Sequence, residues 1–506
     1  MPRRMRFFFI PHFAFCISHL RIRRRTLRNY FYERNAMTAI KKAKNLTEGA
    51  LIPQILLFSL PLIATSILQL LFNTADMVVV GRWGGDTPEA SANSLAAVGS
   101  CSSLITLLVN FFMGLGAGSG ICVAHDIGAR HDDDVRETVH TSILLALIAG
   151  AIVTAIGMIA AYPLLFLMGS DEAVLPEAAA YMRAYFCGMP ACMLYNFCAA
   201  ILRAKGDTVR PMIFLSIGGA ANVLFNLIAV IGFRWGAIGV GAATALSQWI
   251  ACILVVLYMT RMEGPCRIDP KSIRMKRDKV KRILRIGVPT GIQSSLFSIA
   301  NVLIQSTVNS FGPIVMAGDS AGKNLDSYVY SAQNAFYHSA MTFVAQNKGA
   351  RKYDRIKKAI LCSTLLVVVI GITVGVAVWL LSPVLLTVYA PGNQAVVDAG
   401  YVRITVMALT YFLCGLMEVG TGAMRGMGKS ILPTAVSLIG SCLLRIVWIF
   451  TIFAWLRPML DPMQALTLLY IAYPVTWIIT SAAHFICTAI ELRKYKKELL
   501  LEGTLS

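Results

Sequence analysis

Residues 51–80 read LIPQILLFSLPLIATSILQLLFNTADMVVV, an apolar stretch long enough to cross a bilayer as one helix. Eleven comparable runs follow, near 95–125, 138–165, 174–203, 209–232, 236–260, 288–311, 325–346, 358–382, 398–424, 431–456 and 464–490. The 506-residue chain is 57% hydrophobic and only 14% charged, which is too little charge to cover a soluble surface. The sequence therefore predicts an all-α polytopic membrane protein with twelve transmembrane helices.

The basic residues predict how these spans are oriented. Of the 46 Lys and Arg residues, 39 fall in the terminal segments and in every second connection, with 10 of them in residues 261–285. Since basic loops stay on the cytoplasmic side, both termini and this loop are expected in the cytoplasm, at the cytoplasmic (inner) membrane. The same bias accounts for the net charge of +20 without a nucleic-acid partner.

The first 36 residues differ from the rest of the chain. They hold 9 Arg residues and one acid, and their apolar run is too short to span a bilayer. We expect residues 1–36 to be a non-native or disordered basic extension, with Met37 as the start of the native protein.

Three pairs of similar segments indicate that the second half of the chain repeats the first. They are ILLFSLP at 55–61 with ILRIGVP at 283–289, GAR at 128–130 with GAR at 349–351, and RAKGDTVRP at 203–211 with RGMGKSILP at 425–433. Each copy has six spans, and six is even, so both copies enter the membrane from the same side. This predicts two parallel six-helix lobes around a central cleft. The predicted boundaries are 37–260 for the N lobe, 261–287 for the inter-lobe loop, 288–490 for the C lobe and 491–506 for the tail.

The first span carries polar residues on one face. Gln69, Asn73 and Asp76 lie at helical spacing, and Pro61 would allow the helix to bend. Asp76 either pairs with Arg82 near the interface or acts as a carboxylate that binds a proton or a cation, because an acid inside a span is costly unless it is neutralised.

The fifth span carries an amide pair. Asn222 and Asn226 are spaced i, i+4 and share a face. Their oxygens suit a hard cation such as Na⁺, although amide bonding between helices explains the pair equally well. Thr244, on the sixth span, is either part of this site or a close-packing residue.

Two features of the second half are candidates for coupling or substrate binding. Glu418 lies in the middle of the tenth span and is either functional or salt-bridged to Arg445. The eighth span is unusually polar, which predicts a water-facing cavity wall, and His338 is expected there as a hydrogen-bonded residue. Four residues of this span form one stripe: Asp326, Tyr330, Gln333 and Tyr337.

Several chemistries are disfavoured by what the sequence lacks. The 12 Cys residues stand singly, and no nucleophilic triad or metal-ligand spacing is present. Residues 428–430 read GKS, but the glycine that a phosphate-binding loop needs is replaced by Ala423. We expect no enzyme, no cofactor and no metal beyond Na⁺, with transport driven by an ion gradient. A membrane enzyme, a channel and a receptor are less favoured alternatives.

The segments NTAD at 73–76, QNKGAR at 346–351 and MRGMG at 424–428 resemble signatures of the multidrug and toxic compound extrusion (MATE) family. The resemblance covers residues 47–495. It implies a secondary exporter of organic cations or drugs, and an N-lobe cation site at Asp76, Asn222, Asn226 and Thr244. Many members have Asp where this chain has Asn226. One branch of the family uses C-lobe acids, and the matching positions here are Phe297 and Cys414, with Glu418 one turn from the latter.

Together these observations predict an antiporter that exports organic cations by alternating access in exchange for Na⁺ or H⁺. It is expected to work as a monomer in the lipid bilayer. The alternative is a flippase of a lipid-linked precursor with the same two-lobe plan. Its cavity would have to be wide and basic, and the spans supply few arginines, which disfavours it.

Overall fold

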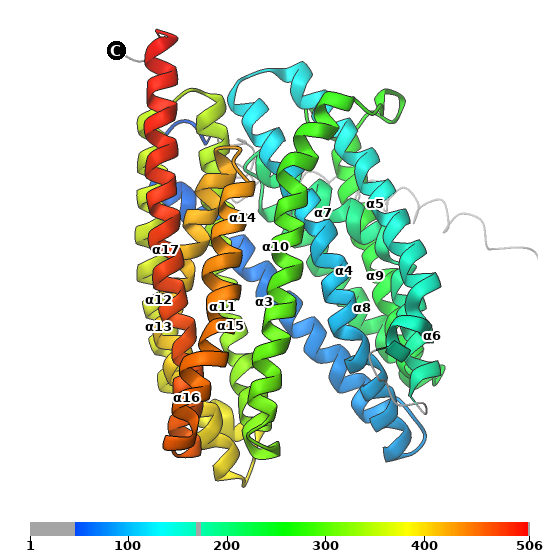
Figure 1. Ribbon diagram of the computed structural model, residues 1–506. Coiled ribbons are helices and arrows are strands. Elements are labelled where there is room, and N and C mark those ends of the chain that lie inside the picture. The colour runs from blue at the N-terminus through cyan, green and yellow to red at the C-terminus, as the bar shows by residue number, and fades with distance from the viewer. Residues whose placement is uncertain (1–45, 168–173, 504–506) are drawn as a thin grey trace, which may run out of the picture. The chain divides into compact units, whose positions relative to one another are not determined.

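The computed structural model describes residues 46–167 and 174–503, so the predicted extension at residues 1–36 lies outside the described part. The described residues belong to one compact unit, Leu46–Ser506. Within them the regular secondary structure is helical throughout (Figure 1).

The helices of the first half end at the 262–276 connection. They are α3 (Leu51–Trp83), α4 (Pro88–Gly128), α5 (Asp132–Leu167), α6 (Leu175–Phe186), α7 (Met189–Ala204), α8 (Val209–Asn226), the π-helix η1 (Leu227–Gly232) and α9 (Gly236–Arg261). The connection itself contains the short 3₁₀-helix η2 (Pro270–Ser272).

The second half repeats this order, but α13 is continuous where the first half has α6 and α7, and the helix after it is divided into short segments. Its elements are α10 (Arg277–Asn309), α11 (Pro313–Gly349), α12 (Tyr353–Tyr389), α13 (Gln394–Gly426), α14 (Ile431–Ser437), η3 (Leu438–Leu443), α15 (Leu444–Trp448), η4 (Ile449–Phe453), α16 (Ala454–Leu456), η5 (Arg457–Met459) and α17 (Pro462–Leu501). The segments η3 and η4 are π-helices, and η5 is a 3₁₀-helix.

The described helices confirm a polytopic membrane protein but refine the number of spans. Ten of them are long and apolar enough to cross a bilayer, and α6 with α7 makes an eleventh, bent by 44°. The predicted eighth span lies in α11, which is long enough but is not among these ten. Its polar and charged residues lower its hydropathy, so α11 depends on neighbouring helices, and not on lipid, to surround it.

Glycines let α4 pack directly on α10. A Cβ at Gly114 would lie 2.3 Å from the backbone nitrogen of Gly291, and a Cβ at Gly118 would lie 2.7 Å from the carbonyl oxygen of Ile283. Small residues at such positions allow close backbone approach between transmembrane helices. The two helices therefore form a tight contact between the first and the second half of the chain.

The repeated Gly-Ala-Arg motif forms a reciprocal crossing between α4 and α11. A Cβ at Gly128 would lie 1.9 Å from the carbonyl oxygen of Gln346, and a Cβ at Gly349 would lie 2.0 Å from the carbonyl oxygen of His125. Each motif therefore supplies the glycine that the other needs. The structure gives the physical reason why both halves carry this motif.

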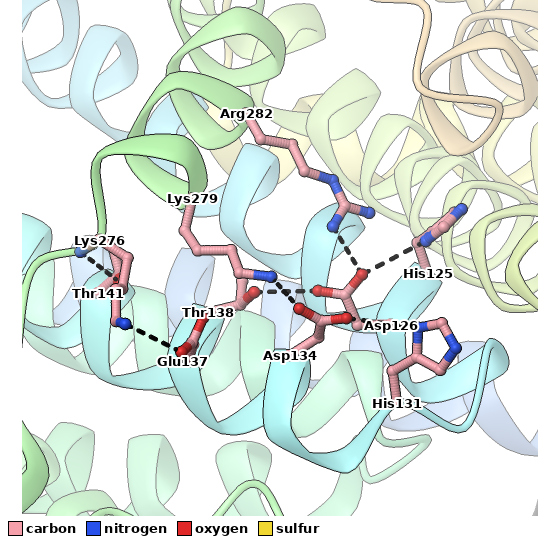
Figure 2. Close-up of polar contacts among 10 residues, drawn as sticks. All are labelled: His125, Asp126, His131, Asp134, Glu137, Thr138, Thr141, Lys276, Lys279 and Arg282. Carbon is pink, nitrogen blue, oxygen red and sulfur yellow. Dashed lines mark hydrogen bonds and ion pairs between the residues drawn. The ribbon is translucent and has the colours of Figure 1, made fainter.

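Ion pairs add to the contact at this end of the helices, which carries the 262–276 connection and is called the basic end below. Figure 2 shows Arg282 donating to Asp126 at 2.6 Å, with Lys279 bound to Asp134. These bonds join the start of α10 to α4 and α5. Towards the opposite end, α4 and α10 separate (Figure 1). The two halves are thus joined at the basic end.

The 262–276 connection is held against α5. The backbone nitrogen of Asp269 donates to Nε2 of His140 at 3.1 Å. The side chain of Asp269 accepts from the Ser272 hydroxyl at 2.7 Å and from the Lys271 backbone at 3.1 Å, and these hydrogen bonds lower the pKa of its carboxyl group. The connection is therefore an ordered part of the basic end.

Candidate functional site

Close packing of α3 on α8 positions the predicted acid of the first half. The ring of Phe72 fills the space beside Gly219, where a Cβ would lie 1.8 Å from the ring. One turn later on α3, Asp76 faces α8. The absence of a side chain at Gly219 therefore sets the distance at which Asp76 meets the amide pair.

The structure brings four predicted residues together from three helices. The amide nitrogen of Asn226 donates to the carboxylate of Asp76 and lies 3.4 Å from Oδ1 of Asn222. The amide nitrogen of Asn222 lies 3.3 Å from the hydroxyl of Thr244. We call Asp76, Asn222, Asn226 and Thr244 the Asp76 cluster. Both amides are buried, whereas Asp76 and Thr244 are partly accessible.

Oxygen atoms dominate the Asp76 cluster. Oδ1 of Asn226 is buried and accepts no hydrogen bond in the described part of the chain. The nitrogen of the same amide donates to the carboxylate of Asp76, and α8 changes into the π-helix η1 immediately after Asn226. Irregular π-turns often mark functional sites in helices. A carboxylate with amide and hydroxyl oxygens is a ligand set that suits a hard cation, and the carboxylate can instead take a proton.

The other predicted residues of the first span lie apart from this cluster. Among the described residues no ion pair joins Asp76 to Arg82. The alternative interpretation of Asp76, as the partner of Arg82 near the interface, is therefore not supported. Gln69 lines the central cavity described next, whereas Asn73 is exposed and does not line it. The helix α3 continues through Pro61 without a break.

A cavity of about 740 Å³ lies between helices of the two halves. Helices α3, α4, α7 and α8 line it from the first half, and α10, α11, α13, α15 and α17 line it from the second. Of the predicted second-half residues, Asp326, Tyr330, Tyr337 and Glu418 line it, and so does His338. Phe297 and Cys414, the positions that match the C-lobe acids of the family, also line it.

Gln333 is a correction to the predicted stripe. It is fully buried and does not line the cavity. A Cβ at Gly371 or Gly415 would lie 2.4 Å or 2.1 Å from its side-chain amide. Gln333 therefore fills the space that glycines of α12 and α13 leave, because its position on α11 faces those helices.

Asp326 belongs to a buried ion triad. Arg403 donates from Nη1 to Asp319 at 2.7 Å and from Nε to Asp326 at 2.8 Å. The hydroxyl of Tyr470 also donates to Asp319, at 2.6 Å. The triad joins α11 to α13, and the hydroxyl of Tyr470 adds α17. Because both acids share one arginine, neither is a free carboxylate.

Glu418 has no ionic partner in the described part of the chain. The predicted alternative, a salt bridge to Arg445, is absent there, since Arg445 donates from Nε to the Thr476 hydroxyl at 3.0 Å. Glu418 is half-buried and borders the cavity. Among the described residues it is the one cavity-lining acid outside the triad of Arg403.

Sequence reasoning missed the basic residues of the cavity. Five of them line it: Arg203, Lys323, Arg403, Arg425 and Arg445. The expectation that the spans supply few arginines is therefore wrong for the cavity. Arg203 and Arg425 end their helices and, like Lys323, fall in predicted connections, while Arg403 and Arg445 stand inside predicted spans. An unexplained charge inside a span was the signal that could have found these last two.

Comparison with known proteins agrees with this architecture. A family model described as MatE matches residues 61–228 and 289–451. The probable multidrug resistance protein YoeA of Bacillus subtilis is 27% identical over 390 residues, which cover 76% of this chain and 82% of the relative. A FAD transporter of Shewanella oneidensis is 26% identical over 299 residues, which cover 58% of this chain and 64% of the relative.

Solved structures share the same fold. A multidrug resistance MATE family transporter of the MOP superfamily, in an outward-facing conformation, superposes with a TM-score of 0.82 at 20% identity. The match covers 90% of this chain and 99% of that chain. It confirms the all-helical fold class.

Proposed function

The chain belongs to the MATE family of multidrug efflux transporters, which are not enzymes, and from this premise we propose that it is a secondary antiporter driven by Na⁺ or H⁺. It exports a small molecule by alternating access through the central cavity. The observation that carries the proposal is the Asp76 cluster, in which an intramembrane carboxylate accepts a hydrogen bond from the amide nitrogen of Asn226, while the amide oxygen of Asn226 accepts none within the described residues.

The cost of a charged acid in the membrane supplies the driving step. An ionised carboxylate in a span costs about 2.5–3.5 kcal/mol on insertion scales. Binding of Na⁺ or H⁺ at Asp76 removes that charge and rearranges its hydrogen bond with Asn226. A cation can shift the two transporter states only by the difference in its affinity for them, so the cluster must differ between the states.

The helix α3 connects the Asp76 cluster with the cavity and the second half. Its first part packs on α11, where the hydroxyls of Ser59 and Ser339 lie 2.6 Å apart and the rings of Phe58 and Phe343 are 5.8 Å apart. Its middle lines the cavity through Gln69, and its last part carries Asp76. A shift of α3 on cation binding would therefore change the cavity wall, which links the two fluxes.

Closure at the basic end supports an outward-facing state. The glycine crossing of α4 and α11 and the ion pairs of α10 join the halves there. By the positive-inside rule this end lies in the cytoplasm together with both termini. We also propose the boundaries 37–260 and 288–490 for the two lobes that move relative to each other, with residues 261–287 between them and 491–506 as a tail.

Two substrate classes are candidates for the exported molecule. Organic cations are the class that the sequence predicts, and the multidrug resistance relative supports a broad range of drugs. The relative described as a FAD transporter supports a different class, because FAD carries phosphate groups. The five basic residues of the cavity also revive the flippase alternative, whose lipid-linked substrate would carry phosphates.

The test is dye export from vesicles that contain the purified full chain, with Na⁺ and pH gradients imposed separately. Asp76→Asn should abolish export driven by either gradient, while leaving the amount and thermal stability of the protein unchanged. Asp86→Asn is the matched control, because Asp86 lies at the exposed surface and pairs with Arg234 at 2.9 Å. Wild-type export by Asp76→Asn would refute the proposal.

A further inference from the structure

The basic residues of the cavity outnumber the acids that could neutralise them. Asp319 and Asp326 are both bound by Arg403. No ion pair joins the other four basic residues to an acid within the described ranges: Arg203, Lys323, Arg425 and Arg445. A buried charge without a counter-ion is costly, so charges that persist in a transmembrane cavity point to a ligand.

Arg445 is the best placed of these residues to hold a ligand. It is 4% exposed, and its Nε is positioned by the Thr476 hydroxyl at 3.0 Å. Its guanidinium carbon lies 4.2 Å from the ring centre of Tyr473. Within the described residues Nη1 and Nη2 have no hydrogen-bond partner. Neither nitrogen is completely buried, and Arg445 lines the cavity. Two parallel donors of this kind match a carboxylate or a phosphate.

Aromatic side chains lie beside Arg445 on the same wall. The ring of Trp477 is 5.2 Å from that of Tyr411 and 5.7 Å from that of Tyr473. The ring of Tyr330 is 6.5 Å from that of Tyr411. All four residues line the cavity. Such a wall offers a planar apolar group large contact area next to a fixed positive charge.

We propose that this wall of the cavity binds an organic anion: a small molecule with a carboxylate or phosphate group on an aromatic body. Nη1 and Nη2 of Arg445 hold the acidic group, and Trp477 and Tyr411 contact the aromatic body. Lys323 and Arg425 add positive charge around the same space. The inference rests on the proposed export function, and it makes the exported molecule an anion.

The same contacts argue against an organic cation as the main substrate. The guanidinium carbon of Arg445 lies 4.2 Å from the ring centre of Tyr473 and 5.7 Å from that of Trp477, so its charge would repel a cation that approached these rings for cation–π contact. Glu418 is the one cavity-lining acid outside the triad of Arg403 within the described residues. An incoming cation would meet four basic residues that form no ion pair within the described part of the chain, whereas an anion would neutralise them.

The sign of the substrate also decides how export responds to the membrane potential. If one monovalent cation enters for each monovalent anion that leaves, two positive charges move inward per cycle. Exchange of a cation for a monovalent cationic substrate moves no net charge. An inside-negative potential should therefore accelerate export of the anion and leave one-for-one export of a cation unchanged.

Two dyes with similar three-ring bodies and opposite charge test the proposal: carboxyfluorescein, an anion, and rhodamine 6G, a cation. Binding to the purified full chain is measured by fluorescence anisotropy, without any ion gradient. The wild-type protein should bind carboxyfluorescein more tightly. Arg445→Gln should weaken that binding by at least about tenfold without weakening the binding of rhodamine 6G.

Two further variants control for structural damage. Arg457→Gln removes an arginine outside the cavity and should bind both dyes like the wild type. Arg445→Lys keeps the charge but loses the paired donors, so it should bind carboxyfluorescein with intermediate affinity, and it carries the test if Arg445→Gln does not fold. Tighter binding of rhodamine 6G to the wild type, absence of carboxyfluorescein binding, or wild-type affinity in Arg445→Gln would overturn the proposal.

Transport separates this inference from the function on which it rests. Vesicles loaded with carboxyfluorescein should export it faster under an imposed inside-negative potential when a cation gradient is present. If Arg445-dependent binding is found but neither a Na⁺ nor a pH gradient drives export, the antiport proposal fails and the anion site stands. If the gradients drive export of rhodamine 6G alone, the anion proposal fails and antiport stands.

Discussion

The helix that follows the Arg-x-x-Gly motif occurs twice in the chain, and its two copies share one π-helix, although the second copy has another, η3. The π-helix η1 begins at Leu227, and the π-helix η4 begins at Ile449. The offset of 222 residues between them is the offset that relates Arg203 to Arg425. The duplicated halves have therefore kept an uncommon feature of helix geometry at the same place.

The charges at this place differ between the halves. At the same offset Asn226 corresponds to Trp448, and Asp76 corresponds to Ile304 at the offset of 228 residues between Pro61 and Pro289. The second half thus has apolar residues where the first half has its acid and amide, and Arg445 stands close by. We propose on this basis that one half binds the coupling cation and the other binds the charge of the substrate.

The largest effect is expected where the halves are alike, at the glycine crossing of the basic end. Gly128→Leu must push α4 away from α11. A clash of about 3 kcal/mol would shift the equilibrium away from the state closed at the basic end by roughly a hundredfold. Export from vesicles should fall accordingly. Gly99→Leu on the same helix is the control, because nothing lies within 4 Å of a Cβ there. Equal rates for both variants would contradict the role of the crossing.

The next effect separates structural arginines from ligand-binding ones. Arg403→Met leaves Asp319 and Asp326 buried without a partner and should lower the free energy of unfolding by about 3–5 kcal/mol. Arg445→Met should change it by less than about 1 kcal/mol, because no acid loses its partner. Chemical unfolding in micelles measures both. A similar decrease of the free energy of unfolding in both variants would show that Arg445 is needed for stability and not for ligand binding.

A third substitution makes the Asp76 cluster more strongly anionic. Asn226→Asp adds a second carboxylate beside Asp76 and should raise the apparent affinity for the coupling cation about tenfold, because affinity for hard cations grows with the charge of the ligands. The measurement is the export rate as a function of Na⁺ concentration and of pH. Asn309→Asp, at the exposed end of α10, should leave both curves unchanged. If both curves are unchanged in Asn226→Asp, Asn226 has no role in coupling.

The smallest effect is expected at Glu418. Glu418→Gln removes a cavity-lining acid without breaking an ion pair, so the stability of the protein should not change. Binding of carboxyfluorescein should become about two- to fivefold tighter, because one repulsive charge is gone. Anisotropy measures the affinity, and vesicle export measures transport. Complete loss of cation-driven export would show that the coupling cation binds in the second half, contrary to the roles proposed for the two halves.

Much of the architecture could be predicted because it depends on local composition. The apolar runs predicted the spans, and the comparisons confirm the family that NTAD at 73–76 resembles. The spacing of Asn222 and Asn226 placed both amides on one face, and the structure brings Asp76 to that face. The eighth span was the exception to the hydropathy pattern, because most residues of α11 are buried against other helices.

The charge of the cavity could not be predicted in this way. Asp326 was recognised as an unusual residue, but its partner Arg403 lies 77 positions away in the sequence. Gln333 shares the helical stripe of Asp326, yet it packs against Gly371 and Gly415 instead of facing the cavity. Helical spacing gives the face of a helix, but it does not tell which neighbour covers that face.

The sequence by itself determined that this chain crosses a membrane many times, that it is a duplication, and that an acid and an amide pair stand in its first half. These features follow from hydropathy and periodicity, which are properties of neighbouring residues. Only the tertiary structure decided which charges neutralise each other and which, like Arg445, have no acidic partner within the described residues. That outcome depends on contacts between helices distant in the chain, where burial makes each unpaired charge costly.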